Sequence, residues 1–404
     1  MNNKIVLILL ILLIASGCDY QVSLVNPQFT DTSVLEGTNE IPINTRKLLE
    51  GIYQVTVGKE KFGQQLVLKW NRGKLSIYGS KLGIYFILDG GIRDSTLFFE
   101  GKWRYALNTE TGLVRLTYDL SENSLKLVGH YGNELSSLDK NFELTYIRPF
   151  SAEVTNKDFY ILAHRGGGRN SDYVGASENS LEILPFAEYF GANGVEIDVK
   201  LSKDNIPFIY HDETINLRLT SDSPIWGDIE KFTYKQLSTF VILKNGEHIP
   251  TLIETLNYIL DETELKIVWL DMKSEKNTMP YVISIQQEIL SKAKANGRDL
   301  EIVIGLPTEE KRDLFLQQND FKNITSLCEL SLDDTRNTNS SIWAPRWTLG
   351  TQLSSVEQMH NEGRKVFTWT LDQAEFISEF IEYSNFDGIL TNYPTLVSYY
   401  HYAR

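Results

Sequence analysis

The sequence predicts an α/β protein in which a small antiparallel all-β domain precedes a (β/α)8 barrel of the TIM type. Between Leu48 and Pro149, short alternating apolar runs are broken by Gly, Asn and Asp about every 8–12 residues, which is typical of an antiparallel sandwich or barrel. From Phe159 onward, apolar strands alternate with helical windows, as expected for βα units on a parallel sheet. The chain has 404 residues, of which 42% are hydrophobic, and this is enough for two packed cores.

The first 17 residues differ in composition from the rest of the chain. Lys4 precedes ten unbroken aliphatic residues, Ile5 to Ile14. As a helix, this run spans about 15 Å, half of a hydrocarbon core of about 30 Å, so residues 1–17 are predicted to be a signal peptide and not a membrane span. The small residues before Cys18 resemble the bacterial lipoprotein signal, which implies a lipidated Cys18 and an exported protein anchored to a membrane of the bacterial cell envelope. The alternative is a plain secretory signal.

The next two segments are predicted to be a linker and the all-β domain. Residues 18–45 are polar and rich in Thr, Ser and Asn, which predicts a flexible tether. Residues 46–150 form the predicted β domain, and its one histidine, His130, belongs to no catalytic pattern, so the sequence assigns this domain no role. Strands are expected at 51–57, 65–70, 74–78, 97–103, 113–118, 124–128 and 142–146.

The charge argues against one class of partner, and the number of cysteines argues against a disulfide. The net charge is −14 and no block of Lys and Arg occurs, which argues against nucleic acid as a partner. The only cysteines are Cys18 and Cys328. If Cys18 carries lipid, no intramolecular disulfide can form, and Cys328, in an apolar run, is predicted to be a core residue.

Residues 151–404 form the predicted barrel. An insertion near 213–250 is too long for a simple loop and is expected to cover the barrel mouth. Helices are expected at 180–190, 253–260, 281–295, 309–318, 354–362 and 374–383. Eight strands are expected at 159–163, 195–199, 266–272, 301–305, 325–329, 341–344, 366–370 and 388–391.

The second of these strands carries two acids on one face. Residues two apart on a strand point the same way, so Glu196 and Asp198 lie about 6–7 Å apart and repel each other by about 2–3 kcal/mol at an effective dielectric near 20. A bound cation would relieve this repulsion. Asp204-Asn205 is expected to form a two-residue hairpin turn that pairs Asp198 with His211. The alternative is an ordinary hairpin with surface acids and a hydrogen-bonded histidine.

Other chemically active side chains also fall at the predicted strand ends. In (β/α)8 barrels, the site lies at the C-terminal ends of the strands. Carboxylates bind a hard divalent metal, cations offset the charge of phosphoryl oxygens, and two histidines can act as base and acid. The combination therefore suits phosphoester chemistry. The residues at this edge are His164 and Arg165 after the first strand, Glu196 and Asp198 on the second, His211 on its hairpin, Asp271 and Lys273 on the third, and Trp369 on the seventh.

The motifs from about Tyr160 to Pro394 resemble the glycerophosphodiester phosphodiesterase family, whose fold is a (β/α)8 barrel. The first 150 residues lie outside the resemblance. The motifs are His164-Arg165-Gly166, Glu178-Asn179-Ser180, Glu196-x-Asp198-Val199, Asp204, Pro207 through His211-Asp212, Ile249-Pro250-Thr251-Leu252, Val366-x-x-Trp369-Thr370, and Gly388 through Pro394.

The resemblance implies a role for each matching residue. His164 and His211 would be the acid/base pair, and one divalent cation, Ca²⁺ or Mg²⁺, would bind to Glu196, Asp198 and Asp271. The substrate and phosphate would be held by Arg165 and Lys273, with Glu178, Asn179 and Trp369 supporting them. Two positions depart from the family pattern: Asp271, where the family has Glu, and Asn392, where it often has Asp.

The predicted reaction is metal-assisted hydrolysis of glycerophosphodiesters to glycerol 3-phosphate and an alcohol. The residues leave open which histidine is the base and whether a cyclic phosphate forms. One alternative is a lysophospholipase D or phospholipase C-like enzyme that acts on membrane lipid, whose partner would be a lysolipid head group reached from the lipid anchor. Another is a lipoprotein that only binds its ligand without catalysis.

Replacing Cys18 by Ala is expected to move the protein from the membrane fraction to the soluble fraction, because the predicted lipid anchor would be lost. Fractionation of cells that express either form measures this. Cys328→Ala is the control and should stay with the membrane. Identical fractionation of Cys18→Ala and the parent would contradict the lipoprotein prediction.

Overall fold

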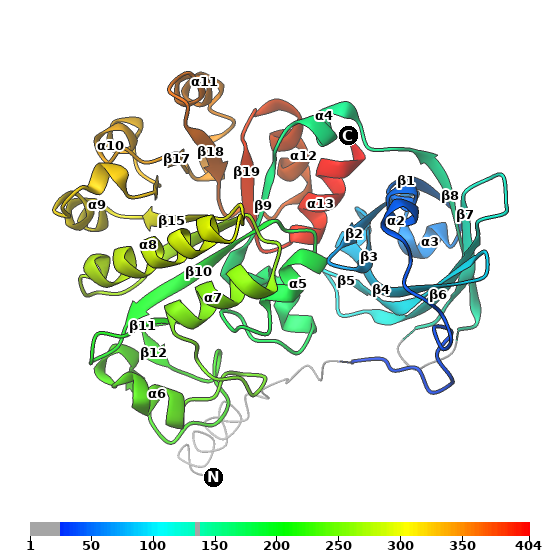
Figure 1. Ribbon diagram of the computed structural model, residues 1–404, viewed down its shortest axis with the longest axis horizontal. Helices are drawn as coiled ribbons and strands as arrows, with labels where there is room; N and C mark the ends of the chain where they lie inside the picture. The colour runs from blue at the N-terminus through cyan, green and yellow to red at the C-terminus, as the bar shows by residue number, and fades with distance from the viewer. Residues whose placement is uncertain (1–24, 134–137) are drawn as a thin grey trace, which may run out of the picture.

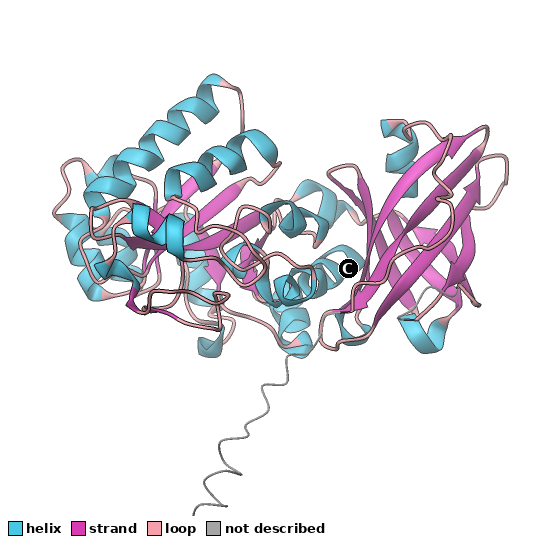
Figure 2. Cartoon of the chain, turned by 90° about the horizontal axis from the view of Figure 1, so that it is seen from below, coloured by secondary structure: helices cyan, strands magenta, loops and turns pink. Residues whose placement is uncertain are grey.

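The computed structural model describes residues 25–133 and 138–404, which form two closed barrels side by side (Figure 1). The first is an antiparallel β barrel, and the second is a parallel barrel surrounded by helices (Figure 2). The predicted fold class is therefore confirmed. The predicted signal peptide, residues 1–17, and Cys18 lie outside the described residues. In the described part of the chain, no helix has both the length and the apolar character needed to cross a membrane.

The antiparallel barrel is of the up-and-down type. Each strand pairs with its neighbours in the sequence, and β1 pairs with β8 to close the sheet. Aromatic side chains fill its interior, among them Phe62, Phe86 and Phe142, with the last two stacked at 5.6 Å. The strands are β1 Gly51–Val57, β2 Gln65–Asn71, β3 Lys74–Tyr78, β4 Ile84–Arg93, β5 Thr96–Tyr105, β6 Thr111–Asp119, β7 Lys126–Tyr131 and β8 Lys140–Arg148, and the short helix α3 Lys59–Phe62 follows β1.

Strand β4 has no counterpart in the sequence prediction. It contains Asp89-Gly90-Gly91, which interrupts the apolar alternation and has the composition of a turn. The glycines serve close packing here, because a Cβ at Gly91 would lie 2.0 Å from Oγ1 of Thr38. The segment before β1 therefore packs against β4.

The prediction of a polar tether is wrong for residues 25–45, which lie against the antiparallel barrel. Arg115 of β6 forms a bidentate pair with Asp31 at 2.6 and 3.0 Å, and its guanidinium lies 4.4 Å from the centroid of Phe29. Asn39 forms a β-bridge with Ile92, and Ile41 is buried. A few anchoring side chains thus fix a segment whose average composition is polar. Helix α2 Ile43–Leu49 then leads into β1.

The second barrel has eight parallel strands. Strand β9 pairs with both β19 and β10, which closes the sheet, and β11 is an antiparallel addition to β10. The strands are β9 Tyr160–Ala163, β10 Gly194–Leu201, β14 Ile267–Met272, β15 Glu301–Leu306, β16 Ser326–Cys328, β17 Ile342–Trp343, β18 Lys365–Thr368 and β19 Gly388–Thr391, with β11 at Pro207–Ile209. Cys328 is buried in β16, as predicted.

Helices cover the outside of the parallel barrel. The prediction at 180–190 was too long, because the chain is not helical before Leu184 and Pro185 occupies the first turn. The C-terminal helix and the helix after β16 were not predicted. The helices are α4 Ala152–Asn156, α5 Leu184–Tyr189, α7 Leu252–Glu262, α8 Met279–Ala295, α9 Glu309–Leu316, α10 Leu332–Asn337, α11 Leu353–Asn361, α12 Ala374–Tyr383 and α13 Pro394–Ala403.

The hairpin after β10 differs from the prediction by one residue. Val199 pairs with Ile209 and Leu201 with Pro207, so Asp198 lies opposite Tyr210 and not opposite His211. The loop has three residues, 203–205, because Ser202 N–H bonds Ile206 O and Asn205 adopts a φ of 64°. Asn tolerates this left-handed conformation better than most residues, which explains why the turn is longer than the Asp-Asn pair suggested.

The insertion after His211 folds as a small unit with its own apolar core, which includes Phe208, Ile229 and Leu237. Glu247 ties it to the barrel by accepting hydrogen bonds from the backbone N–H and hydroxyl of Ser177, at 2.8 and 2.7 Å. Its elements are β12 Thr214–Ile215, β13 Gly227–Asp228 and α6 Tyr234–Phe240.

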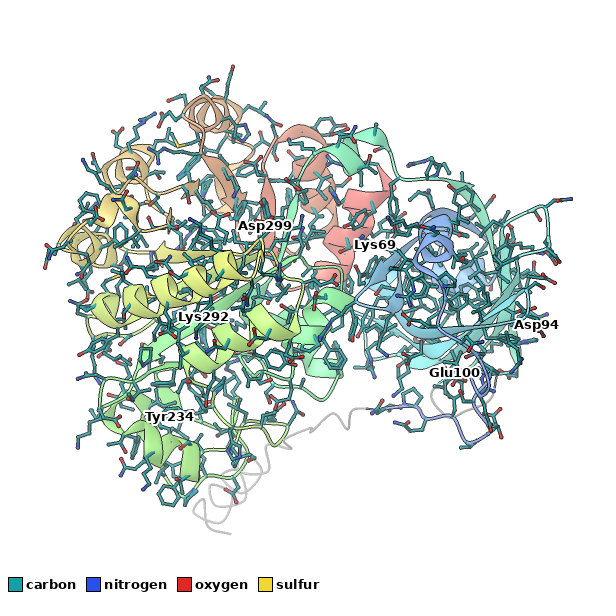
Figure 3. The ribbon with its side chains drawn as sticks, viewed as in Figure 1. Lys69, Asp94, Glu100, Tyr234, Lys292 and Asp299 are labelled. Carbon is teal, nitrogen blue, oxygen red and sulfur yellow. The ribbon has the colours of Figure 1, made fainter. Side chains whose placement is uncertain are left out.

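The two barrels meet where β2, β3 and β4 face α5 and α13 (Figure 1). The Tyr78 hydroxyl donates to Tyr189 O at 2.8 Å, and Tyr85 packs edge-on against Phe190 at 5.4 Å. Lys69, at this boundary in Figure 3, lies 5.2 Å from the ring centroid of Tyr402. The interface is therefore both apolar and hydrogen-bonded.

One buried acid also lies at this interface. Glu188 of α5 is 5% exposed, accepts a hydrogen bond from Glu264 N–H at 2.8 Å, and lies 3.8 Å from Arg72 of the β2–β3 turn. Burial raises the pKa of Glu188 to about 7, and the bond from Glu264 and the charge of Arg72 only partly oppose this. The interface therefore contains one carboxyl group that is expected to change its protonation state near neutral pH.

Glu188→Gln is expected to be more stable than the parent protein at pH 8, and the difference between the two proteins should be much smaller at pH 5. A carboxyl with a pKa of about 7 when folded and about 4.5 when unfolded makes folding less favourable as pH rises through that window, by up to about 3 kcal/mol. Thermal unfolding of both forms at the two pH values measures the difference. The exposed Glu182→Gln is the control. Equal effects of Glu188→Gln at both pH values would contradict the prediction.

Candidate active site

The inner face of the parallel barrel determines which side chains reach its mouth. Leu162, Trp269, Leu327, Ala344 and Phe367 belong to the cluster that fills the barrel interior. Residues two positions further along each strand lie on the same face, at the C-terminal end. On β10 the inward-facing residues are acidic and not apolar, because its Val and Ile side chains pack outward among the helices. The rim residues reached in this way are His164, Glu196 and Asp198, Asp271, Glu329, Arg346, Trp369 and Asn392.

Three of the predicted residues form a carboxylate cluster. One oxygen each of Glu196, Asp198 and Asp271 lies within 4.8 Å of the other two. Asp198 and Asp271 are direct neighbours in the parallel pairing of β10 with β14. Glu196 and Asp198 are almost fully buried. The strand register alone therefore brings three acids into a space of the size that one cation occupies.

The oxygens of this cluster fit a cation. Oε1 of Glu196, Oδ1 of Asp198 and Oδ1 of Asp271 are buried and have no hydrogen-bond partner. Burial, followed by mutual repulsion, raises the pKa of Glu196 well above its usual value, and burial likewise raises the pKa of Asp271 against the opposing effect of Lys273. An all-oxygen site of this kind suits Ca²⁺ or Mg²⁺. The donor set therefore matches the cation that the sequence predicts.

Arg165 and Asn179 hold the cluster in position. Arg165, at a φ of 54°, donates its backbone N–H to Oε2 of Glu196 at 2.9 Å, and its side chain bonds Glu178 at 3.0 Å. Asn179 donates its amide to Oδ2 of Asp198 at 2.8 Å and accepts the backbone N–H of Asp198 at 3.2 Å. Asn179 therefore positions a carboxylate of the cluster.

His164 has a defined tautomer. Its Nδ1 lies 2.9 Å from Oδ1 of Asn392, and the Asn392 amide donates to Asp372 at 2.8 Å. Because the Asp372 carboxylate only accepts hydrogen bonds, the amide orientation is fixed, and Nδ1 of His164 must donate. Its Nε2, 3.7 Å from Oε2 of Glu196, is then free to take a proton. Burial, followed by the charge of Arg165, lowers the pKa of His164.

His211 has a charged partner in place of an amide. Its Nδ1 lies 2.7 Å from Oδ1 of Asp212, which also accepts from Arg218 at 2.6 Å. Burial raises the pKa of Asp212, but the bonds from Arg218, His211 and Asn216 outweigh it and lower the pKa overall. Nε2 of His211 has no partner among the described residues, so both histidines offer Nε2 for proton transfer.

One further cation and an open pocket complete the mouth. Nζ of Lys273 lies 2.6 Å from Asp271 and 4.0 Å from Asp198. Burial opposes its charge, but Asp271 and Asp198 raise the pKa of Lys273, so it stays cationic. Lys273 and His211 line a pocket of about 500 Å³. The described residues thus place a cation and a histidine around a space large enough for a phosphodiester.

Trp369 belongs to another part of the rim. Its indole N–H donates to Ala344 O at 2.8 Å, and the Arg346 guanidinium covers its ring at 4.8 Å. Trp369 directly follows the end of β18, and in the order of the strands around the barrel β18 is not a neighbour of β10 or β14, which carry the three carboxylates.

The sequence analysis missed three groups of this site. Arg218, from the insertion, joins Asp212 to Glu178 at 2.6 to 3.2 Å, and nothing in the local sequence indicates this contact. Asp372 fixes Asn392 and lies three residues beyond Trp369, where a strand end was already expected. Glu329 follows Leu327 by two residues, so the period of β16 could have identified it.

Comparisons with known proteins give a consistent result. The model of the glycerophosphoryl diester phosphodiesterase family matches residues 164–396, more than half of the chain. A glycerophosphodiester phosphodiesterase of Caldanaerobacter subterraneus subsp. tengcongensis is 28% identical over 248 residues, which cover 59% of this chain and 96% of that protein. Among solved structures, an Oleispira antarctica phosphodiesterase in complex with the product sn-glycerol-3-phosphate is 21% identical with a TM-score of 0.48, covering 60% of this chain and 97% of that one.

Glu196→Gln is expected to raise the unfolding temperature in the presence of chelator by about 2–4 °C, because it removes one of three mutually repelling buried charges. The Gln side chain can still accept the Arg165 N–H. The same substitution should remove most of the stabilisation that Ca²⁺ or Mg²⁺ gives the parent protein. Thermal unfolding with chelator and with each metal measures both effects.

The exposed Glu357→Gln is the control and should leave both temperatures unchanged. A parent protein that neither ion stabilises, or a Glu196→Gln protein that is less stable in chelator, would contradict the assignment of this cluster to a cation.

Proposed function

The chain belongs to the glycerophosphoryl diester phosphodiesterase family, and from this premise we propose that its barrel hydrolyses glycerophosphodiesters to glycerol 3-phosphate and an alcohol, using one divalent cation and the proton-transfer pair His164 and His211. The activity class follows from the family. The observation that carries the rest is the cluster of three carboxylates, each with one buried and unpaired oxygen, next to His164 and Lys273 at the barrel mouth.

In this proposal, Glu196, Asp198 and Asp271 hold the cation. When bound, the cation supplies a Lewis acid that polarises the phosphoryl group and offsets its charge. Asn179 keeps Asp198 in place, and the backbone N–H of Arg165 does the same for Glu196. The cation is Ca²⁺ or Mg²⁺, because every ligand is a carboxylate oxygen.

Arg165 and Lys273 bind the phosphate. Nε of Arg165 is buried without a hydrogen-bond partner, 3.7 Å from Asp198, and is therefore available to a phosphoryl oxygen. Lys273 lies on the other side of Asp198. Two cations held in position by Glu178, Asp198 and Asp271 are already oriented toward the phosphoryl oxygens, whereas solvent would have to reorganise around them.

The histidines move the protons of the reaction. One Nε2 takes a proton from the nucleophile, which is water or the neighbouring glycerol hydroxyl, and the oxygen of that nucleophile bonds to phosphorus. The P–O bond to the alcohol breaks, and the other histidine gives its proton to the leaving oxygen. Where the glycerol hydroxyl is the nucleophile, the product of this step is a cyclic phosphate, and a water molecule then attacks phosphorus and breaks the ring P–O bond to give glycerol 3-phosphate. The Asp212 carboxylate bonds Nδ1 of His211 and orients its ring, and the Asn392 amide holds His164 in its Nδ1–H tautomer.

A second candidate substrate is a lysophospholipid. Leu217, Trp226 and Phe240 are exposed on the insertion that follows His211, and apolar side chains beside a mouth can contact an acyl chain. Turnover of lysophosphatidylcholine against glycerophosphocholine distinguishes the two candidates. We also propose export and membrane anchoring through Cys18, which the apolar run from Ile5 to Ile14 supports.

His164→Ala and His211→Ala are each expected to lower kcat for glycerophosphocholine by about 10²–10⁴-fold, the usual contribution of a proton-transfer group. Their unfolding free energies should stay within about 1–2 kcal/mol of the parent, because both rings are partly exposed at the rim.

Choline release with chelator and with Ca²⁺ or Mg²⁺ added back measures this activity. His130→Ala, on the exposed face of β7, is the control and should be fully active. Full activity of either rim variant, or full activity in chelator, would overturn the proposed mechanism.

A further inference from the structure

Half of the barrel rim has no part in the metal and histidine chemistry. Glu329, Arg346 and Trp369 follow the fifth, sixth and seventh strands, each two residues beyond a side chain of the interior cluster. By strand period they therefore lie on the inward-facing side at the C-terminal ends of these strands. Arg346 and Trp369 are also joined by a β-bridge. These three residues are called the distal rim below.

Glu329 carries an unexplained carboxyl oxygen. Its Oε1 is buried and has no hydrogen-bond partner. It is not one of the cluster that could hold the cation. An unpaired buried carboxyl costs free energy, and such a group in a binding site indicates a missing ligand.

Charged groups of both signs surround Glu329. Burial and the charge of Asp271 raise the pKa of Glu329 well above its usual value, while Lys273 and Arg346 act in the opposite direction. Asp271 and Lys273 lie at the end of the third strand and Arg346 follows the sixth, so these charged groups approach Glu329, after the fifth strand, from both directions around the rim. A substrate whose phosphate is bound at Lys273 can therefore extend its organic part toward Glu329.

Arg346 supplies the matching donors. Its side chain is exposed and makes no hydrogen bond or ion pair within the described part of the chain, and its guanidinium is stacked on Trp369 at 4.8 Å. Stacking fixes the plane of the guanidinium and leaves its N–H groups free at the edge.

The distal rim does not suit a quaternary ammonium group. Such a cation binds best over an open aromatic face, but Arg346 covers the Trp369 ring. Lys273 and Arg346 would also repel it. A hydroxyl group fits better, because it can donate to the Glu329 carboxyl and accept from Arg346.

Resting on the function proposed above, we infer that Glu329 and Arg346 form a subsite for the hydroxyl groups of the substrate and are its specificity-determining residues. The hydroxyls belong either to the glycerol of glycerol 3-phosphate or to a hydroxylated leaving alcohol. Both sources offer the same chemistry, an alcohol that donates to the carboxyl and accepts from the guanidinium.

Calorimetric titration of the Mg²⁺-loaded full chain tests the first source, with glycerol 3-phosphate and propyl phosphate as probes that differ only in their hydroxyl groups. The parent protein is expected to bind glycerol 3-phosphate at least about tenfold more tightly than propyl phosphate. This factor corresponds to the contribution of one hydrogen bond to a charged group. Glu329→Leu should abolish this preference and leave propyl phosphate affinity within about twofold. Arg346→Leu, at an exposed position where folding is not at risk, should reduce the preference at least about threefold.

Kinetics tests the second source. If the leaving alcohol is bound, Glu329→Leu should raise KM for glycerophosphoglycerol by about tenfold with kcat nearly unchanged, and should leave KM for glycerophosphocholine unaltered. If the glycerol 3-phosphate half is bound, KM rises for both substrates. Either pattern supports the subsite and identifies its ligand.

Two controls separate this inference from a structural or metal-related role. Glu357→Gln should behave as the parent protein, and the Mg²⁺ affinity of Glu329→Leu should equal that of the parent. The subsite is overturned if Glu329→Leu weakens both phosphate esters equally, weakens Mg²⁺ binding, or leaves the calorimetric preference and every KM unchanged. A hydroxyl preference that depends on Glu329, in a protein that turns over no glycerophosphodiester, would support the subsite and reject the proposed function.

Discussion

Mutual repulsion among three buried carboxylates is the constraint around which the barrel mouth is built. Glu196, Asp198 and Asp271 have one unpaired buried oxygen each, and these oxygens belong to one cluster. Asn179, the Arg165 backbone and Lys273 satisfy only their second oxygens. Without a cation, such a cluster costs stability, so the site is destabilised for the sake of binding. The hydrogen bonds that orient the acids determine where the phosphate can be bound.

The alternation of the strands divides the rim into two halves. Strands β9, β10 and β14 direct His164 and the acids toward the axis, while β16, β17 and β18 direct Glu329, Arg346 and Trp369 toward it. In the proposed function, one half carries the groups for proton transfer and charge, and the other carries the groups that would hydrogen-bond an alcohol. A phosphodiester likewise consists of a charged phosphate and uncharged organic groups. The inward-facing alternation of the barrel strands therefore places groups for both parts of such a substrate on one rim.

Much of this site follows from the sequence because it depends on local geometry. The acids two apart on β10 and the ends of β9 and β14 are fixed by strand period, and the structure brings these residues together. The hairpin was misjudged by one residue, since turn length depends on the φ of Asn205. Arg218 and Asp372 act through contacts between distant segments, which one sequence does not encode locally. Residues 25–45 are fixed by a few anchors such as Arg115 that average composition conceals.

The structure explains why an Asn suits position 392 better than an Asp, which the sequence alone does not show. Asn392 bonds His164 through its oxygen and Asp372 through its nitrogen, at 2.9 and 2.8 Å. An aspartate here would have to face the Asp372 carboxylate with another carboxylate, and one of the two would need to take up a proton. It would also favour protonation of His164, which Arg165 and burial now oppose. The amide joins an acid to a neutral imidazole without adding charge, and it fits a barrel mouth that already contains three repelling acids.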